Sequence, residues 1–446
     1  MQEEMISAIS TAPIASGVAI IRISGQGAFT IAEKMFSGKI AVKEFEPNKM
    51  YAGNISAGEI TDFGYCVIFK APKSYTGEDM VEFHCHGGVA ITRAVLKKTF
   101  QLGCRQAERG EFTKRAFLNG KLSLSSCEGL IDMINAESTA FAKAGYYLYR
   151  EKLLEKVKNC QNELKYVLAL IDANVDYPEE DIESAEIEDI RTRITSVKRE
   201  IEDLLSRYEG SSKIKNGVKV VICGKPNAGK SSILNAIIGA DKAIVTEIAG
   251  TTRDVVESSI DINGVRFDFS DTAGIRESDD IVESIGISRS KKVLATADIV
   301  VFVLDGSTET EKEDEAIYAT VKNSNLIIVK NKSDAAIDAE SKIAWDISVS
   351  AKTLDGIKEL TETIYERSQV DALVTDGEFL TEERHYFALR SALCELDGVL
   401  SKLGIMPLDI LTVELEEAWP KLGLVSGETV TEAVIDEIFS KFCVGK

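Results

Sequence analysis

The stretch Gly224–Ser231 has the sequence Gly-Lys-Pro-Asn-Ala-Gly-Lys-Ser, and it decides the fold of the middle of this chain. It fits the pattern G-x-x-x-x-G-K-[ST], in which a glycine-rich loop turns backbone N–H groups toward a phosphate. The β-branched residues 218–223 before it predict a strand, and residues 232–238 after it predict a helix. Because the N-terminus of that helix adds its positive dipole end, the stretch predicts a nucleotide site, with a chance glycine-rich loop as the alternative.

The polar residues of this loop and of the next strand end suit a triphosphate with a metal ion. Lys230 would reach the β- and γ-phosphates, and the Ser231 hydroxyl would ligate Mg²⁺ together with Thr252. Residues 265–270 alternate as a strand that ends in Asp271, where a carboxylate can hold Mg²⁺ through water. The phosphate-side set that we predict is Asn227, Ala228, Gly229, Lys230, Ser231, Ser232, Thr246, Thr251, Thr252, Asp271, Thr272, Ala273 and Gly274.

A second motif selects the base. The apolar runs 298–304 and 326–329 are typical of buried parallel strands, and the later run ends in Asn-Lys-Ser-Asp. In this N-K-x-D pattern the Asp334 carboxylate faces two neighbouring N–H donors of guanine, which adenine lacks, so ATP would leave a buried carboxylate unpaired. The motifs in this order predict GTP binding. The base-side set is Asn331, Lys332, Asp334, Ser350, Ala351 and Lys352.

Length and composition limit the class of protein. The chain has 446 residues, 44% of them hydrophobic, and a net charge of −20. This length predicts roughly three domains. The negative charge argues against non-specific nucleic-acid binding over the whole surface, although a local basic patch is compatible with it. Eight scattered cysteines without C-x-x-C predict reduced thiols, and the acidic start without an apolar span predicts a cytoplasmic protein with no membrane segment.

Two local clusters have competing interpretations. His84-Cys85-His86 is a metal-ligand candidate, but we favour a backbone role for this stretch through Gly87-Gly88. Residues 93–121 contain only two acids, Glu108 and Glu111, so this stretch is either a basic patch or an ordinary solvated face. Its cations are Arg93, Lys97, Lys98, Arg105, Arg109, Lys114, Arg115 and Lys121.

Periodicity divides the chain into four segments. Residues 1–119 mix short strands and helices, which indicates an α+β domain, and residues 120–212 carry apolar stripes at spacings of three and four, which indicate antiparallel helices with a break at Pro178. Residues 213–369 alternate strand and helix, which predicts a parallel sheet covered on both faces. Residues 370–446 are helical again. The α/β segment is therefore an insertion between two helical halves that pack together, with Gly210-Ser211-Ser212 as the linker.

Motifs along the whole length resemble the family of bacterial tRNA modification GTPases called MnmE or TrmE. Apart from the nucleotide motifs, the resemblance rests on Ile21–Gly25, Thr76–Asp79, His86–Gly88, Gly110–Leu122 and the Cys-Val-Gly-Lys ending. One departure is visible: family members usually carry a Pro-Pro-Gly-Arg-Gly-like turn where this chain has Ala12–Gly17.

The resemblance implies GTP-driven modification of the wobble uridine of certain tRNAs at carbon 5, together with the FAD- and NADH-using partner MnmG (GidA). It also implies an N-terminal domain that binds a 5-formyltetrahydrofolate and forms a homodimer. By motif matching, the folate-binding residues are Arg22, Glu82, Lys121 and Lys446. Cations suit the glutamate tail of a folate and a carboxylate suits the donors of its pterin ring.

The resemblance further implies K⁺-stimulated hydrolysis. Ile275 follows the Asp-Thr-Ala-Gly motif and cannot orient a water, as glutamine does in many small GTPases. K⁺ held by Asn227, Thr246, Ile248 and Thr251 would neutralise the developing charge instead. Glu283 matches the catalytic glutamate of the family, with a salt-bridged surface residue as the alternative. Cys443 is either a thiol exposed for tRNA chemistry or a buried residue of a frayed tail.

Two functional classes stay open at this point. One is the tRNA modification enzyme, and the other is a regulatory G protein that only switches a partner, for instance in ribosome assembly. The Cys-Val-Gly-Lys ending and the folate-like domain favour the enzyme, because a switch alone needs neither.

Overall fold

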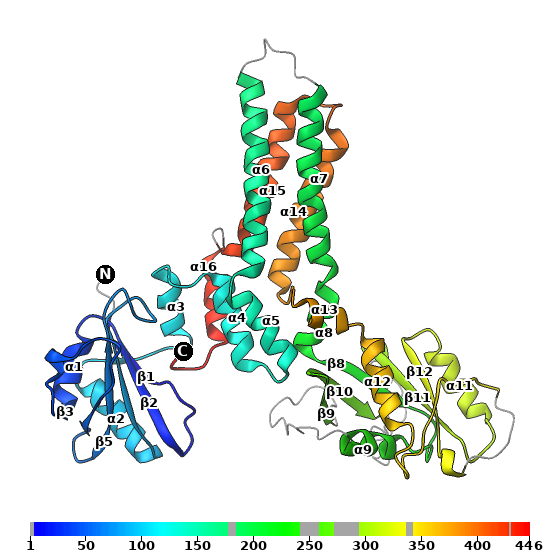
Figure 1. Ribbon diagram of the computed structural model, residues 1–446, viewed down its shortest axis with the longest axis horizontal. Helices are drawn as coiled ribbons and strands as arrows, with labels where there is room; N and C mark the ends of the chain where they lie inside the picture. Colours follow the sequence, from blue (N-terminus) through cyan, green and yellow to red (C-terminus); the bar gives the residue numbers. More distant parts are fainter. Residues whose placement is uncertain (1–3, 177–183, 241–257, 272–293, 336–341, 428–429) are drawn as a thin grey trace, which may run out of the picture. The chain divides into compact units, whose positions relative to one another are not determined.

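The computed structural model describes residues 4–176, 184–240, 258–271, 294–335, 342–427 and 430–446 (Figure 1). Backbone contacts divide the chain into two compact units. The first contains Met1–Ile131, Leu148–Leu154 and Leu422–Lys446, and the second contains Asp132–Tyr147 and Glu155–Lys421. In the described ranges, each helix is too short or too polar to cross a membrane.

A seven-stranded mixed sheet forms the base of the first unit, in the order β3-β4-β5-β6-β2-β1-β7. Neighbouring strands are antiparallel except for β1 and β7, which are parallel. The alternating burial of β5 indicates one core face and one solvated face. The strands are β1 (Ile6–Ile9), β2 (Ser16–Ser24), β3 (Phe36–Gly38), β4 (Tyr51–Ser56), β5 (Thr61–Phe69), β6 (Met80–Gly87) and β7 (Arg105–Gln106).

Helices pack on this sheet, and further helices of the same unit form a second apolar cluster. Helices α1 (Ala28–Met35) and α2 (Val89–Gln101) bury Ile31 and Val95 against Ile21, Ile23 and Phe83 of the strands. Phe112 of α3 (Glu111–Leu118) packs on Ile6 and Ala8 of β1. Helices α4 (Leu124–Asn135) and α16 (Glu432–Ser440) share a separate apolar cluster that includes Leu124, Cys127, Phe439 and Phe442. A short 3-10 helix, η1, spans Val42–Glu44.

A six-stranded sheet in the second unit has the order β13-β12-β11-β8-β10-β9. All pairings are parallel except that of β9 with β10. Strand β8 lies between β10 and β11, so the loop after it lies where the strand order reverses, the usual ligand position of open α/β sheets. The strands are β8 (Val218–Cys223), β9 (Ser258–Ile262), β10 (Val265–Asp271), β11 (Ile299–Asp305), β12 (Leu326–Asn331) and β13 (Ile347–Ser348).

Helices lie on both faces of this sheet, as the sequence predicts. Ile233 of α9 (Lys230–Ala240) and Leu360 of α12 (Ile357–Ser368) share one core with Val220 and Val301. On the other face, Val321 of α11 (Lys312–Val321) belongs to a core with Val300 and Phe302. Consecutive residues of β11 therefore face opposite cores, which explains its unbroken apolar sequence. A 3-10 helix, η2 (Ser333–Ala335), follows β12.

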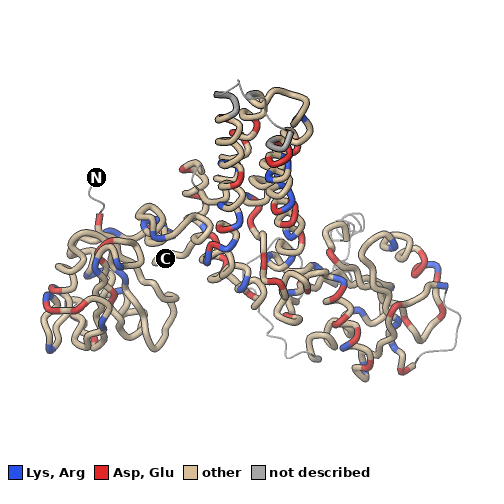
Figure 2. The backbone as a smooth tube through the Cα atoms, turned by 45° about the horizontal axis from the view of Figure 1, so that its top comes forward, with Lys and Arg blue, Asp and Glu red and all other residues tan. Residues whose placement is uncertain are grey.

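Four long helices form one bundle (Figure 1). Two of them precede the α/β segment in sequence, α6 (Lys152–Asp176) and α7 (Ser184–Ser206), and two follow it, α14 (Glu383–Lys402) and α15 (Leu408–Ser426). Helix α7 packs against α14, and Arg191 Nη2 donates to the Leu403 carbonyl at 2.9 Å. The expectation that the two helical halves pack together is confirmed. Figure 2 shows acidic and basic positions interspersed along these helices.

The predicted stripes form the buried faces of the bundle helices. Val157 and Leu164 of α6, Ile194 and Ile201 of α7, and Leu389 of α14 are all buried. The break predicted at Pro178 lies outside the described residues. Helices α5 (Thr139–Tyr149) and α13 (Asp371–Asp376) complete the connections.

The linker predicted at Gly210-Ser211-Ser212 is wrong. These residues belong to α8 (Tyr208–Asn216), the helix that leads into β8. Ser211 is buried and its Oγ accepts a hydrogen bond from Leu380 N–H at 3.0 Å. A Cβ on Gly210 would lie 2.3 Å from Leu373 Cδ1. The glycine therefore serves close packing here, and the polar residues are satisfied inside the fold rather than exposed in a linker.

Candidate functional site

The phosphate loop joins β8 to α9 in a conformation that its glycines permit. Gly224 and Gly229 have φ values of +150° and +91°, and Asn227 has a φ of 64°. A Cβ on Gly224 would lie 2.4 Å from the Val303 carbonyl oxygen, and one on Gly229 would lie 2.2 Å from Asn331 Nδ2. Both glycines are therefore required by backbone conformation and by close approach. Lys230 Nζ donates to the carbonyls of Gly224 and Lys225, each at 3.0 Å, so the predicted phosphate ligand lies across the loop.

Asn331 connects the phosphate loop with the predicted base pocket. Its Nδ2 donates to the Ala228 carbonyl at 2.9 Å, and its Oδ1 accepts from Ala351 N–H at 3.2 Å. Asn331 is buried, so its amide orientation is fixed by these two contacts. The three segments that the sequence analysis selected, 224–231, 331–334 and 350–352, are thus brought together by one side chain.

Asp334 lies beside the residues predicted to close the base pocket. Ser350 Oγ donates to Asp334 Oδ1 at 2.7 Å, and Lys352 Nζ lies 3.9 Å from Oδ2. The hydrogen bond from Ser350 lowers the pKa of Asp334, so the carboxylate is ionised at neutral pH. An ionised carboxylate is acceptor-only, which is the chemistry needed to bind the adjacent N–H groups of guanine.

The described residues also supply oxygen ligands on the phosphate side. Ser231 lies in the first turn of α9, and Asp271 pairs with Ile222 of β8 at the end of β10. A serine in the first turn of α9 and an aspartate at the end of the strand beside β8 are residue types that fit Mg²⁺, which prefers oxygen ligands and neutralises phosphate charge when bound. Asn227 offers an amide oxygen, a donor type suited to K⁺. The predicted residues Thr246, Ile248, Thr251, Thr252, Thr272, Ala273, Gly274, Ile275 and Glu283 lie outside the described residues.

A second site of predicted residues lies on the seven-stranded sheet. Arg22 on β2 and Glu82 on β6 are cross-strand partners, and Arg22 Nε donates to Glu82 Oε1 at 2.9 Å. The guanidinium carbon of Arg22 lies 5.3 Å from the ring centroid of Tyr75 and 5.5 Å from that of Phe112. Burial opposes the charge of Glu82, but contacts with His84 and Arg22 outweigh it and lower its pKa. A cation, a carboxylate and aromatic rings together suit an anionic ring ligand such as a folate.

The C-terminal segment docks on the same unit. Val444 pairs with Arg109 in an antiparallel bridge, and the Lys446 carbonyl accepts from Phe112 N–H at 3.2 Å. Gly445 has a φ of +97°, and a Cβ there would lie 2.2 Å from the Ile9 carbonyl oxygen. Phe442 is buried and Cys443 is exposed. The alternative of a buried cysteine in a frayed tail is therefore wrong: the segment is docked and its thiol is accessible.

Lys446 and Lys121 each contact a segment that also carries a ring beside Arg22. Lys446 adjoins the backbone of Phe112, whose ring neighbours Arg22. Lys121 Nζ donates to the Pro72 carbonyl at 3.1 Å, in the loop that also carries Tyr75.

Comparison with known proteins shows the family of this chain. The family model "GTP-binding protein TrmE N-terminus" matches residues 5–121, and the model "MnmE helical domain" matches residues 124–443. A "tRNA modification GTPase MnmE" from Clostridioides difficile (strain 630) is 38% identical over 100% of this chain and 99% of its own length. The chain belongs to the MnmE family. A second MnmE, from Acetivibrio thermocellus, is 39% identical over 100% of both chains.

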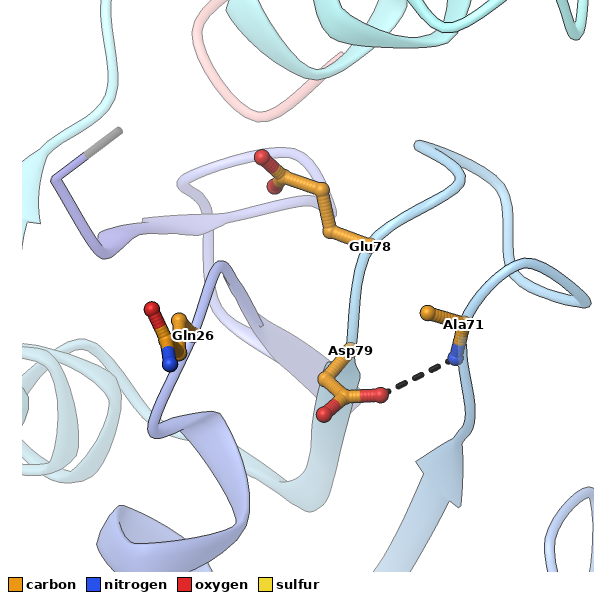
Figure 3. Close-up of a pocket in the computed structure, with 4 residues that line it drawn as sticks. All are labelled: Gln26, Ala71, Glu78 and Asp79. Carbon is orange, nitrogen blue, oxygen red and sulfur yellow. Dashed lines mark hydrogen bonds between the residues drawn. The ribbon is translucent and has the colours of Figure 1, made fainter. Parts of the chain in front are cut away.

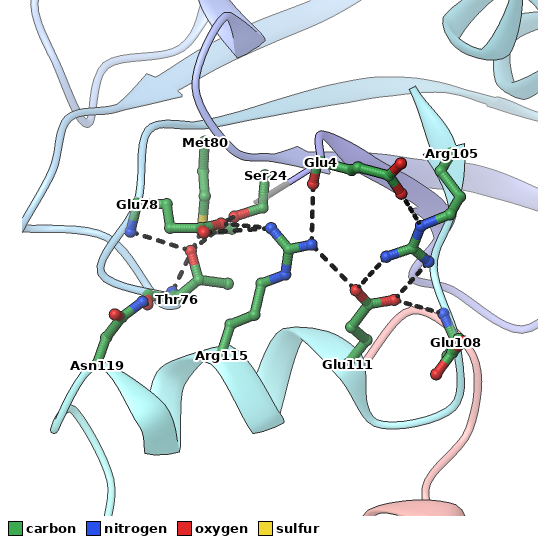
Figure 4. A network of polar contacts seen from close by, with 10 residues as sticks. All are labelled: Glu4, Ser24, Thr76, Glu78, Met80, Arg105, Glu108, Glu111, Arg115 and Asn119. Atoms are coloured by element: carbon green, nitrogen blue, oxygen red, sulfur yellow. Dashed lines mark hydrogen bonds and ion pairs between the residues drawn. The ribbon is translucent and has the colours of Figure 1, made fainter. Parts of the chain in front are cut away.

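In this MnmE-family chain, the basic stretch 93–121 is not a continuous exposed patch. Arg115 is buried, and its guanidinium contacts both Glu78 oxygens at 3.1 and 3.2 Å and Glu111 Oε1 at 3.0 Å (Figure 4). Arg105 pairs with Glu111 at 2.7 Å, and Lys114 pairs with Asp436 at 2.6 Å. Neither a nucleic-acid patch nor a solvated face describes these three cations. Two of the acids that neutralise these cations, Glu78 and Asp436, lie outside residues 93–121. The ion pairs therefore fix α3 against other segments of the unit.

A cavity of about 310 Å³ lies next to this network and is lined by Gln26, Ala71, Glu78 and Asp79 (Figure 3). Asp79 Oδ1 accepts a hydrogen bond from Ala71 N–H at 2.9 Å, and Glu78 is committed to Arg115 and Ser24. The carboxylates of Glu78 and Asp79 therefore stabilise the loop before β6.

The His84-Cys85-His86 cluster divides among different partners. His84 contacts Glu82 at 3.3 Å, and His86 Nδ1 contacts Asp62 at 2.7 Å. The Cys85 thiol is buried, and burial raises its pKa to about 11. Gly87 is close to β2, where a Cβ would lie 2.2 Å from Ser16 Oγ, and Gly88 precedes α2. This agrees with the backbone role predicted for Gly87-Gly88.

Two charged side chains beside the nucleotide motifs were missed by sequence reasoning. Asp305 ends β11 and contacts Lys332, and Lys225 of the phosphate loop contacts Asp314. Asp305 carries the same signal as Asp271, an aspartate at the end of an apolar strand, and could have been found by it. Lys225 has no such signal, because its partners follow 80 or more residues later.

Proposed function

We propose that this chain uses GTP hydrolysis to drive modification of the wobble uridine of certain tRNAs at carbon 5, with addition of a carboxymethylaminomethyl or aminomethyl group. As a member of the MnmE family, it is a GTP hydrolase of tRNA modification. The observation that carries the proposal is the connection of the phosphate loop to the N-K-x-D and Ser350–Lys352 segments through Asn331. A site that selects guanine would make GTP hydrolysis the source of free energy for this reaction.

The docked C-terminus supports direct involvement in the modification. Cys443 is exposed beside a terminal segment held by Phe112 and Ile9, and Phe112 neighbours the Arg22–Glu82 pair. We place a 5-formyltetrahydrofolate at Arg22, Glu82, Lys121 and Lys446, where it would supply a one-carbon group when bound. The remaining partners in this proposal are tRNA, a second copy of the chain and the FAD- and NADH-dependent protein MnmG, all in the cytoplasm.

Mass spectrometry of tRNA nucleosides tests this function. A strain that lacks the gene is expected to lose the modified wobble uridine, and wild-type protein is expected to restore it. Cys443→Ser is expected to abolish restoration and to leave GTP hydrolysis within about twofold of the wild-type rate, because the thiol belongs to a different unit from the nucleotide loop.

Cys394→Ser is the matched control, since Cys394 is also exposed but lies on α14 of the bundle. Intact modification in the Cys443→Ser strain would remove Cys443 from the chemistry. Intact modification in the deletion strain, with active GTP hydrolysis, would favour a regulatory G protein.

We further propose that hydrolysis requires K⁺ near Asn227, with Thr246, Ile248 and Thr251 as the other ligands and Glu283 acting through water. Phosphate release measured in K⁺ is then expected to be at least roughly tenfold faster than in Na⁺ at equal ionic strength. Asn227→Gly tests the ligand directly, because glycine accepts the φ of 64° and removes only the amide. Its rate in K⁺ is expected to fall to the Na⁺ level. Equal wild-type rates in both cations would contradict the proposal.

A further inference from the structure

The segment 305–314, which begins at the last residue of β11, contacts both the base loop and the phosphate loop. Its first residue, Asp305, is paired in register with Asn331 on β12, and Gly306 N–H donates to the Asn331 carbonyl at 2.8 Å. Its last residues begin α11, which approaches Lys225 of the phosphate loop. We call residues 305–314 the bracket.

Asp305 forms the contact of the bracket with the base loop. Asp305 Oδ2 accepts from Lys332 Nζ at 2.7 Å, while Oδ1 accepts from Ser307 N–H at 2.9 Å and from Ser307 Oγ at 2.6 Å. The carboxylate is 7% exposed, so the ion pair is screened less than a surface pair would be. Lys332 itself has a φ of 61°, a left-handed conformation that is strained for a non-glycine residue and persists only where surrounding contacts fix it. The ion pair with Asp305 is such a contact.

Asp314 forms the contact with the phosphate loop. Asp314 Oδ2 accepts from Lys225 Nζ at 3.3 Å, and the same oxygen accepts from Glu311 N–H at 3.0 Å as part of the capping box of α11. Thr308 Oγ1 lies 3.1 Å from Lys225 Nζ. Both Lys225 and Asp314 are buried. The carbonyl of Lys225 in turn accepts from Lys230 Nζ, so the pair fixes the part of the loop that holds the predicted phosphate ligand.

We propose that Asp305 and Asp314 are positioning residues for GTP, which act through Lys332 and Lys225 to hold the base loop and the phosphate loop at a fixed separation. The bracket contacts both loops through charged pairs. Nucleotide affinity therefore depends on these two carboxylates, although neither belongs to the G-x-x-x-x-G-K-[ST] or N-K-x-D motif. This inference rests on the proposed GTP site.

Asp305→Asn separates the two functions of this side chain. The amide oxygen can still accept from Ser307, but the amide nitrogen replaces the oxygen that faces the Lys332 ammonium and turns an attraction into a repulsion. We expect the affinity for fluorescent GDP and the apparent KM for GTP to weaken roughly tenfold, the usual cost of a charge-assisted hydrogen bond, with kcat within about twofold.

Asp298→Asn is the matched control. Asp298 immediately precedes β11, at its opposite end, and accepts a hydrogen bond from Lys219 N–H at 2.8 Å. Its loss would lower thermal stability without touching either nucleotide loop. Asp298→Asn is therefore expected to leave the KM for GTP unchanged, even if its Tm falls as much as that of Asp305→Asn.

A double-mutant cycle tests whether Asp305 acts through Lys332. The Lys332→Met variant is expected to bind GDP more weakly than the wild type. In that background Asp305→Asn is expected to lower the affinity for GDP by less than about twofold further, because the partner of Asp305 is already absent. Asp314→Asn, which keeps the capping acceptor and removes the charge, is expected to weaken GDP binding about threefold in the wild-type background and negligibly with Lys225→Met.

Additive losses in the first cycle, or an unchanged KM in Asp305→Asn, would overturn the bracket. This outcome differs from a failure of the proposed function, in which the wild-type chain itself would not bind GDP.

Discussion

Asp334→Asn is expected to lower the affinity for GTP by roughly 10⁴-fold and to make xanthosine triphosphate the better ligand. The ionised carboxylate accepts from two guanine N–H groups, and an asparagine presents a donor where one of those acceptors was. Xanthine carries an oxygen in place of the guanine amino group, so it accepts from that donor. The substitution leaves the local structure in place, because the asparagine oxygen can still accept from Ser350 Oγ, which now contacts Asp334 Oδ1 at 2.7 Å.

Equilibrium titration with fluorescent guanosine and xanthosine diphosphates measures this switch. Asp355→Asn is the control: Asp355 is exposed, lies in the same region of the chain and accepts from Thr353 Oγ1 at 2.6 Å. It is expected to keep the wild-type preference for guanine. A variant Asp334→Asn that still prefers the guanosine nucleotide would show that the base is read elsewhere, and the GTP site would have to be reassigned.

The parts of the nucleotide site that sequence predicts best are those where a local rule is sufficient. Residues 218–223 are mostly apolar and β-branched, and β8 spans that same range. Glycines at 224 and 229 are required by positive φ values, a demand that any phosphate loop of this kind makes. Asn331, Lys332 and Asp334 follow a buried strand, where the chain must leave the sheet at its carboxyl edge.

Contacts between distant segments could not be predicted in this way. The cations of α3 look exposed in sequence, but Arg115 is buried because Glu78, from another strand connection, comes within 3.1 Å of it. Gly210-Ser211-Ser212 has the composition of a linker, yet the packing of Leu373 and Leu380 makes it part of a helix. Strand β4 has no clear strand pattern in its sequence because it contains glycine and asparagine, and its Gly53 is required where a Cβ would lie 2.5 Å from the Ser37 carbonyl oxygen.

A partly buried charge cluster at the entrance to the α/β segment is another such contact. Lys215 of α8 contacts Asp132 Oδ1 at 3.0 Å and also pairs with Glu382, the residue that precedes α14. The cluster thus joins the helix that enters β8 to the helix that resumes after the α/β segment. Thr381 Oγ1 lies 3.5 Å from Asp132 Oδ2, and the Lys215 ammonium lies 6.0 Å from the Phe141 ring.

Lys215→Met is expected to lower the free energy of unfolding by about 3 kcal/mol at pH 9, where both Asp132 and Glu382 are ionised, because it leaves two carboxylates near each other without their shared cation. This is the low end for a buried ion pair, chosen because the Lys215 side chain is 26% exposed. Urea unfolding of the purified chain measures the change. Lys213→Met is the matched control on the same helix: Lys213 pairs with Glu209, which is 85% exposed, and its loss is expected to cost less than about 0.5 kcal/mol.

The same cluster predicts a pH dependence with a definite sign. Burial, and then the neighbouring charge of Glu382, raise the pKa of Asp132 to about 8, although Lys215 opposes the shift. The unfolded chain releases this proton near pH 4, its ordinary value. Between these two pH values the folded state binds a proton that the unfolded state has lost, so this site makes the protein less stable as the pH rises through the window.

Asp132→Asn removes that titration and keeps the pairing of Lys215 with Glu382. Its Tm relative to that of the wild type is therefore expected to rise between about pH 6 and pH 9, because only the wild type must ionise a buried carboxylate across that range. Thermal unfolding at both pH values tests this. A Tm difference that stays constant or falls would mean that Asp132 is already ionised and stabilised by Lys215 at pH 6. The cluster would then be a simple buried salt bridge, and the Asn substitution would destabilise the protein at both pH values.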